Sequence, residues 1–271
     1  MDDAAPGRRW NLPPIRESTY PTPVDLTSRR SGIRALATVP PAGNVAVREA
    51  HVAGVACVIC EPPDRSGVAL YFHGGGYRLA PEHPFPAGLT DAAGVYEHVL
   101  GEAKPPLLIG DSAGGGLAAA VTVAAAGGGF PAPVGLILMS PWLDLSCRAE
   151  TFSSRAASDQ LFSLAAAQEA AAMYLQGHDP GDPLVSPVRA ELDGWPPVLL
   201  MASTGEVLLQ DSVTFAGMLA LAGNDLACWF SKGVPHAWPA VFPDLPETTM
   251  ALAAVETFTQ TLAEPGNSRG H

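Results

Sequence analysis

At residues 105–120 a short apolar run is followed by a serine between glycines and then by an alanine-rich stretch. The run Leu107–Ile109 is typical of a buried strand, and the alanine-rich stretch after it is typical of a helix. The residues that join them have the pattern Gly-x-Ser-x-Gly, in which small residues at Gly110 and Gly114 permit a sharp, strained turn. Such a strand, turn and helix would lift Ser112 into an open site. They also require a fold in which helices pack on a β-sheet.

The chain from residue 44 onward alternates β-like runs with helical stretches, which predicts an α/β fold with a mostly parallel sheet flanked by helices. The β-like runs are Val45–Val52, Val55–Cys60, Val68–Phe72, Leu107–Ile109, Val134–Met139, Val198–Ala202 and Leu226–Phe230. The helix candidates are Gly88–Leu100, Leu117–Ala126, Ser163–Leu175, Ser212–Leu221 and Thr248–Leu262. The later β-like runs are apolar throughout, as the strands of a buried parallel sheet are.

We expect the main domain at residues 44–263, with an N-terminal arm before it, an insertion within it and a short tail after it. Residues 1–43 are rich in Pro, Arg, Ser and Thr without clean periodicity, so we expect an N-terminal arm or cap. Residues 146–187 interrupt the alternation with an alanine-rich helix and a cluster of turn residues, which favours a small helical cap inserted over the sheet's carboxyl edge. Residues 264–271 are expected to be a frayed tail.

The charge and the hydropathy pattern exclude several classes of partner. The formal net charge of −12 disfavours nucleic acid and anionic membrane surfaces, so we expect neither as a partner. No apolar run is long enough to span a membrane. The N-terminal residues lack the apolar core of a signal peptide, so we expect a cytoplasmic protein. Nothing in the sequence indicates an oligomeric state.

Two of the four cysteines form a Cys-x-x-Cys pattern, at Cys57 and Cys60. That spacing also occurs in metal and redox sites, but this chain has no second Cys-x-x-Cys and no paired histidines nearby. Cysteines that β-branched residues flank in a strand behave as small apolar side chains. We therefore expect these two to fill apolar space, and we expect no metal site.

A dinucleotide site is a competing interpretation of the glycines, because Gly114–Ala119 also fits Gly-x-Gly-x-x-Ala. In such sites the glycines begin at the end of the strand, whereas here they begin five residues beyond Ile109. No acidic residue closes a strand about twenty residues later, where a ribose would be held. The sequence therefore favours Ser112 as a nucleophile.

A second glycine motif, His73–Gly76, follows the apolar run Val68–Phe72 directly. A serine that attacks a carbonyl carbon creates a developing oxyanion, and preorganised N–H groups stabilise it by about 3 kcal/mol each. We expect the N–H groups of Gly74, Gly75 and Ala113 to form this oxyanion hole.

The other catalytic groups should follow late strands of the sheet. Glu206 comes just after the run Val198–Ala202, where its carboxylate can reach a histidine. Asp211, within the next predicted helix, is the less favoured acid. His236 lies in a loop after Leu226–Phe230, the last predicted strand, which suits a mobile general base. The histidines at 51, 83, 98 and 178 all precede that strand.

The two glycine motifs together resemble those of the hormone-sensitive-lipase-like branch of the α/β-hydrolases. Four further stretches are similar to that family in the same order: Tyr77–Pro86, Ser140–Leu145, Pro196–Leu200 and Gly233–Trp238. The resemblance implies the α/β-hydrolase fold and a serine carboxylesterase that cleaves small, fairly apolar esters or lactones through an acyl-enzyme, without a metal or an organic cofactor. It also suggests that the cap helix and Trp10 or Trp142 line the pocket.

The chain departs from this family directly after the glycine motif His73–Gly76. In the family a few dozen residues, which form a helix and a strand, separate that motif from the stretch that begins here at Tyr77, whereas Gly76 and Tyr77 are adjacent. We expect the loss of that strand to bring two others together or to leave backbone groups unpaired. The connection from Phe72 to Leu107 is still long enough for a crossover through a helix, so a parallel sheet remains possible.

Two alternatives to ester hydrolysis stay open because of this departure. One is a pseudoenzyme whose apolar pocket binds a hydrophobic small molecule without turnover. The other is a biosynthetic enzyme that uses the same pocket and His236 for elimination or cyclisation.

Overall fold

The computed structural model describes residues 8–19, 25, 28, 43–64, 66–77, 81–102 and 104–263. Most of the expected N-terminal arm and the whole expected tail at 264–271 therefore lie outside the described residues.

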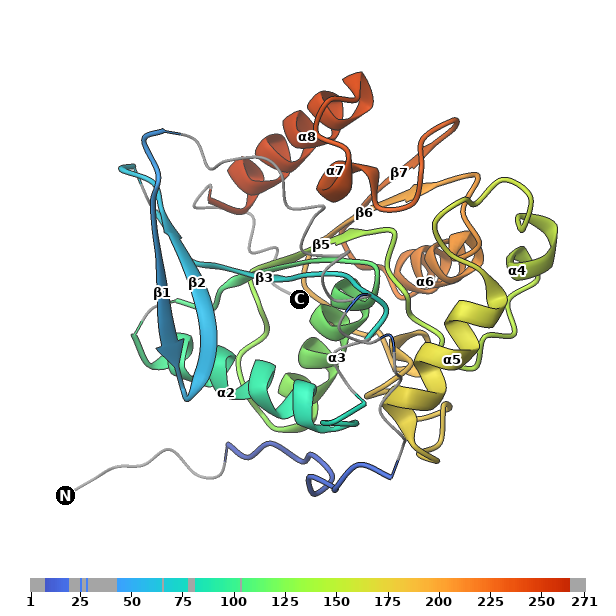
Figure 1. Cartoon of the computed structure of the whole chain (residues 1–271). Helices are drawn as coiled ribbons and strands as arrows, with labels where there is room; N and C mark the ends of the chain where they lie inside the picture. The colour runs from blue at the N-terminus through green and yellow to red at the C-terminus, as the bar shows by residue number, and fades with distance from the viewer. Residues whose placement is uncertain are drawn as a thin grey trace.

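A five-stranded parallel sheet forms the centre of the protein (Figure 1). Its strands, in spatial order, are β3 (Ala69–Phe72), β4 (Leu107–Asp111), β5 (Gly135–Met139), β6 (Val198–Ser203) and β7 (Leu226–Ser231). The three central strands are almost completely buried, which explains why their sequences are apolar on both faces. The predicted parallel α/β fold is confirmed.

Helices cover both faces of this sheet (Figure 1). One face packs against α2 (Ala87–Glu102), α3 (Ala113–Gly127) and α6 (Leu209–Leu221), and the other against α7 (Trp238–Val241) and α8 (Pro246–Ala263). Within the described part of the chain no helix is long and apolar enough to cross a membrane.

The side chains of the central strands alternate between two apolar cores. Leu136, Leu138 and Leu200 point toward α3 and α6 in the larger core, and Ile137 and Met201 lie in the smaller one with α7 and α8. Because both cores depend on the same strands, the register of the sheet is strongly specified.

The first two strands stand apart from the central sheet. β1 (Ala46–Val52) and β2 (Val55–Glu61) form an antiparallel hairpin whose side chains are exposed or half-buried on both faces (Figure 1). Cys57 and Cys60 are free thiols, and Cys60 is exposed. The expectation that both fill apolar space is therefore wrong for Cys60, because this residue lies on the exposed face of β2, whereas Cys57 lies on the half-buried face.

β3 is an edge strand among the described strands, with β4 as its neighbour on one side. Tyr71 in this strand is 51% exposed, and Val68 directly before it is 41% exposed. The family strand that would lie beside β3 is the one that the sequence lacks. Of the two expected consequences, the sheet therefore shows the unpaired edge, and the hairpin does not close the gap.

The segment expected to form the cap contains α4 (Thr151–Ser154) and α5 (Leu164–Leu175), and the 3-10 turn η1 (Pro187–Arg189) follows it. Residues 8–19 of the arm link the main domain with this segment. Trp10 stacks on Phe130 with 4.1 Å between ring centroids, and an Arg16 Nη2 donates to the Leu175 carbonyl oxygen at 2.9 Å.

Two glycines lead to opposite predictions for the same substitution. A Cβ on Gly110 would collide with the Gly114 carbonyl group in the first turn of α3, so Gly110→Ala should destabilise the protein by at least about 3 kcal/mol. Gly217 lies inside α6 with nothing within 4 Å of its Cβ position, so Gly217→Ala should stabilise it by about 0.5–1 kcal/mol. Urea unfolding followed by circular dichroism measures both, and an unaffected Gly110→Ala protein would contradict the close approach.

Candidate active site

Ser112 occupies a strained turn between β4 and α3. Its backbone has φ 52° and ψ −120°, outside the common regions for a residue with a Cβ. Two hydrogen bonds of 2.9 Å hold this conformation, from the Ser112 N–H to the Met139 carbonyl oxygen and from the Trp142 N–H to the Ser112 carbonyl oxygen. A Cβ on Gly114 would collide with the Phe72 carbonyl oxygen, so only glycine lets α3 start this close to β3.

Ser112, His236 and Glu206 lie in hydrogen-bonding contact at the carboxyl edge of the sheet. His236 Nε2 is 3.0 Å from Ser112 Oγ, and His236 Nδ1 is 3.0 Å from Glu206 Oε2. The three residues follow β4, β7 and β6 respectively, so adjacent loops bring them together. The Glu206 side chain is 0% exposed and the His236 side chain 10% exposed, which keeps water away from both contacts.

Two buried serines fix the loops that hold this acid and base. Ser203 Oγ donates to the Val234 carbonyl oxygen at 2.6 Å and accepts the Gly205 N–H at 3.1 Å. Ser140 Oγ accepts the Ala237 N–H at 3.0 Å, directly after the histidine. Neither serine was predicted to act on these loops, because their only signal in the sequence is a polar residue at the end of an apolar run.

The charges around His236 set its protonation. Burial lowers its pKa, but the hydrogen bond and the charge of Glu206 raise it, and Asp159 and Asp111 add to the rise, so the net pKa is raised. A general base must be neutral, and the imidazole is therefore ready to accept a proton only above this raised pKa.

Residues 146–187, the segment expected to form a cap, reach the site through Asp159 and Phe162. The Asp159 carboxylate accepts the N–H groups of Phe162 at 3.0 Å and Val207 at 2.9 Å, which ties this segment to the Glu206 loop. The Phe162 ring is parallel to the His236 imidazole to within 16°, with 6.1 Å between centroids, and its edge contacts Trp142. An apolar surface therefore lies beside the base.

The two tryptophans expected at the pocket differ in position. Trp142 is fully buried and packs behind Phe162. Trp10 packs on Phe130, just beyond the carboxyl end of α3, whereas Ser112 lies at the amino end of that helix. The expectation that Trp10 lines the pocket is wrong, because a helix of this length separates the two positions by about 20 Å.

Gly74 does not supply a free donor for an oxyanion. Its N–H donates to Asp111 Oδ1 at 2.8 Å, so the expectation that it belongs to the oxyanion hole is wrong in this arrangement. Gly75 and Gly76 follow with φ 126° and 61°, a region that favours glycine. The Ala113 N–H lies in the first turn of α3 and has no acceptor within the helix. Gly75 and Ala113 remain as the expected donors.

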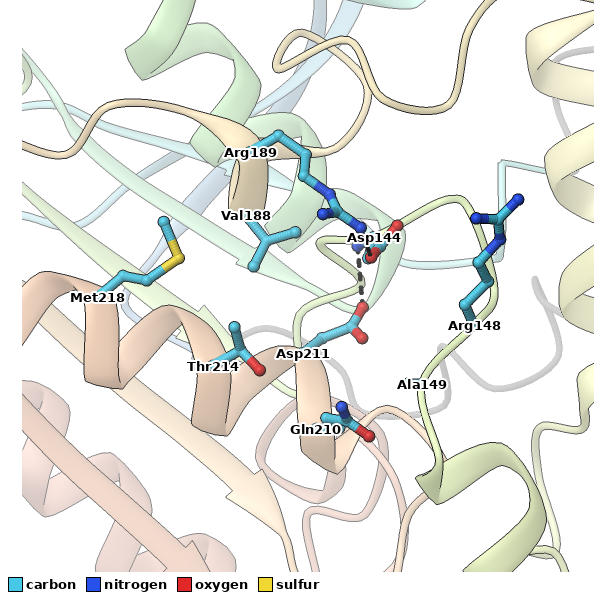
Figure 2. Close-up of a pocket in the computed structure, with 9 residues that line it drawn as sticks. All are labelled: Asp144, Arg148, Ala149, Val188, Arg189, Gln210, Asp211, Thr214 and Met218. Carbon is cyan, nitrogen blue, oxygen red and sulfur yellow. Dashed lines mark hydrogen bonds and ion pairs between the residues drawn. The ribbon is translucent and has the colours of Figure 1, made fainter.

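Asp211, the alternative acid, holds a backbone loop, and the carboxylate in contact with His236 is that of Glu206. Its Oδ2 accepts the N–H groups of Leu143 and Asp144, both at 2.9 Å, and so holds the loop after β5. The contact with Asp144 lies beside a cavity of about 350 Å³ along α6 (Figure 2). The cavity is lined by Asp144, Arg148, Ala149, Val188, Arg189, Gln210, Asp211, Thr214 and Met218. None of these is Ser112, Glu206 or His236.

The sequence and the fold both match known proteins. A family model described as alpha/beta hydrolase fold matches residues 76–240. An acetyl-hydrolase of Streptomyces hygroscopicus is 36% identical over 75% of this chain and 68% of its own length. An esterase of Acinetobacter venetianus is 35% identical over 69% of this chain and 63% of its own length. The chain thus spans about two thirds of these relatives.

Solved structures agree more completely in length. The crystal structure of EstE5 soaked with ethyl alcohol has a TM-score of 0.83 at 33% identity and covers 91% of this chain and 94% of its own. An esterase from the bacterial hormone-sensitive lipase family has a TM-score of 0.82 at 29% identity, with the same coverage.

Asp211 gives a prediction for stability against pH. Burial raises its pKa to about 7, the charges of Asp144 and Glu206 add to the rise, and the two N–H bonds oppose it. The folded protein therefore binds a proton that the unfolded chain releases, and this contribution to stability is lost as the pH rises through 7. Asp211→Asn keeps an acceptor for both N–H groups but has no charge.

We expect Asp211→Asn to be more stable than the parent by about 2 kcal/mol at pH 8, with the difference shrinking as the pH falls toward 4. Urea unfolding at several pH values measures this. A variant that is less stable than the parent at pH 8 would show that the carboxylate charge itself is needed.

Proposed function

This chain belongs to the alpha/beta hydrolase fold family and is a carboxylic ester hydrolase of its hormone-sensitive-lipase-like branch, and we propose that Ser112 is its nucleophile. The observation that supports this assignment most directly is the pair of 3.0 Å contacts that joins Ser112, His236 and Glu206 in one line. The order nucleophile, acid, histidine along the chain also fits this fold.

In the proposed mechanism, His236 removes the proton of Ser112 as Oγ attacks the ester carbonyl carbon. The negative charge moves to the carbonyl oxygen, where the N–H groups of Gly75 and Ala113 stabilise it. His236 then gives its proton to the departing alkoxide, which leaves an acyl-enzyme. A water that His236 deprotonates attacks this acyl group, and the carboxylic acid leaves as Ser112 regains its proton.

Glu206 acts on the histidine. Its carboxylate accepts a hydrogen bond from Nδ1, which leaves Nε2 free to take the serine proton, and its charge stabilises the imidazolium that forms. The reaction needs side chains, backbone amides and water, so the proposal includes no cofactor.

We propose short, apolar esters as the substrate class. The Phe162 ring beside His236 and the buried Trp142 behind it support an apolar acyl or alcohol group. A relative named acetyl-hydrolase and a similar structure soaked with p-nitrophenyl butyrate support a short acyl chain. In this proposal residues 146–187 act as a cap on a catalytic domain at 44–263, since Asp159 and Phe162 come from that segment.

The pseudoenzyme and the biosynthetic enzyme are not favoured. The missing strand lies beyond β3, whereas the three proposed catalytic side chains follow β4, β6 and β7. The departure from the family pattern therefore leaves these side chains in contact.

Replacing the nucleophile gives the first test. The parent should hydrolyse p-nitrophenyl acetate and butyrate, and Ser112→Ala should lower kcat by at least about 10⁴-fold, because the covalent path is removed. Circular dichroism must show that both proteins are folded. A folded parent without turnover would contradict the proposed function, and full activity in Ser112→Ala would require a reaction without this serine.

A second test concerns the acid limb of the pH profile. Glu206→Gln removes the charge that raises the pKa of His236, so the rise of kcat/KM with pH should move to lower pH. The plateau should fall by about 10²–10⁴-fold, because the amide no longer orients and stabilises the imidazolium.

The matched control is Glu49→Gln, which removes an exposed carboxylate on the β1–β2 hairpin. It should change neither the limb nor the plateau. An unmoved acid limb in Glu206→Gln would argue that Glu206 does not act on His236.

A further inference from the structure

Three parts of the active site meet at one carboxylate oxygen. The Tyr71 hydroxyl donates to Asp111 Oδ1 at 2.6 Å, and the Gly74 N–H donates to the same oxygen at 2.8 Å. Asp111 is the last residue of β4 and directly precedes Ser112, while Tyr71 lies on β3. One carboxylate therefore connects the edge strand, the nucleophile turn and the glycine motif.

The second oxygen of this carboxylate lies against the Gly74 backbone. A Cβ on Gly74 would collide with Asp111 Oδ2 and would lie only 3.0 Å from Asp111 Cγ. Glycine is needed at position 74 because the carboxylate fills the space of a side chain. The first glycine of the motif thus lets Asp111 hold the segment and leaves the oxyanion to the residues after it.

The other end of the motif is fixed by an aromatic contact. The Tyr77 ring stacks on Tyr174 of α5 with 4.2 Å between centroids, and its hydroxyl oxygen lies close to Gly116 of α3. The segment Gly74–Tyr77 is therefore held at its start by Asp111 and at its end by Tyr77. Between these points only Gly75 and Gly76 set the direction of the backbone N–H groups.

We propose that Tyr71 and Asp111 are positioning residues for oxyanion stabilisation, because their shared hydrogen bonds hold Gly74 so that the Gly75 N–H faces the carbonyl oxygen above Ser112. This inference rests on the proposed function. Neither side chain needs to touch the substrate: they act through the backbone of the glycine motif.

Electrostatics gives the tyrosine hydroxyl a second role. A carboxylate next to a developing oxyanion would repel it unless hydrogen-bond donors stabilise the carboxylate charge. About half of the Tyr71 side chain is exposed, but its hydroxyl is partly buried against Asp111. Burial of this hydroxyl, and then the charge and the hydrogen bond of Asp111, raise the pKa of Tyr71 well above its usual value, so the hydroxyl stays protonated and donates. Removing it would loosen the motif and leave more of the Asp111 charge facing the site.

The decisive variant is Tyr71→Phe, which deletes the hydroxyl and keeps the ring. We expect kcat for p-nitrophenyl butyrate to fall about tenfold with KM changed by less than about twofold, because the interaction acts in the transition state. The affinity of a phenylboronic acid, which forms a tetrahedral anionic adduct with a serine, should fall by a similar factor.

Tyr96→Phe is the matched control. Tyr96 lies in the core on α2, and its hydroxyl donates to the Pro131 carbonyl oxygen at 2.8 Å, away from Ser112. This variant loses a tyrosine hydrogen bond just as Tyr71→Phe does. It should lower the thermal midpoint and leave kcat and the boronic acid affinity unchanged.

Substitutions of Asp111 test the other partner. We expect Asp111→Ala to lower kcat about a hundredfold, because it removes the acceptor of both hydrogen bonds. The Asp111→Asn side chain can still accept both bonds through Oδ1, so its kcat should stay much closer to that of the parent. Because the Asp111 charge also raises the pKa of His236, kcat is compared on the pH plateau of each variant. If Asp111→Ala does not fold, Tyr71→Phe alone decides.

Three outcomes would overturn the inference: kcat of Tyr71→Phe within twofold of the parent, a rise in KM alone, or an equal loss of kcat in Tyr96→Phe. Failure of the proposed function looks different, because the folded parent would then lack turnover. An active parent whose Tyr71→Phe variant keeps its kcat and its boronic acid affinity would refute only the positioning role.

Discussion

The fold depends on how closely the backbone passes itself at the turn around Ser112. Gly110 and Gly114 lie so near to one another and to the end of β3 that a Cβ on either would meet a carbonyl group. This approach places the start of α3 against β3 and β4 and holds Ser112 in the turn between β4 and α3. The hydrogen bonds of Ser112 to Met139 and Trp142 then fix β5 and the following loop on the same centre. The position of α3 against β3 and the strained turn at Ser112 are thus two results of one steric constraint.

Much of this arrangement could be predicted from the sequence, because apolar periodicity and turn residues report local structure directly. The strands of the central sheet and the five longer helices agree with the prediction to within a few residues, although α3 begins at Ala113 instead of Leu117 because the glycines continue into the helix. Glu206 and His236 could be chosen from their places after late strands.

Long-range contacts could not be predicted from the sequence, because a sequence pattern does not say which distant atom fills the space beside a glycine. The role of Gly74 depends on the Asp111 carboxylate, which is distant along the chain. The position of Trp10 depends on its stacking with Phe130 at the far end of α3. Likewise, Ser140 and Ser203 act on loops that only the folded sheet brings next to them.

The junction of Gly76 and Tyr77 has a consequence for how such enzymes can evolve. A parallel sheet built from strand and helix units can shorten at its margin by whole units, provided that the reactive groups belong to the units that remain. Here the described part of the sheet ends at β3, and the β1–β2 hairpin stands apart from it with little core of its own. A sheet of these five strands is thus enough to bring the three proposed catalytic side chains into contact, and changes at its margin need not disturb them.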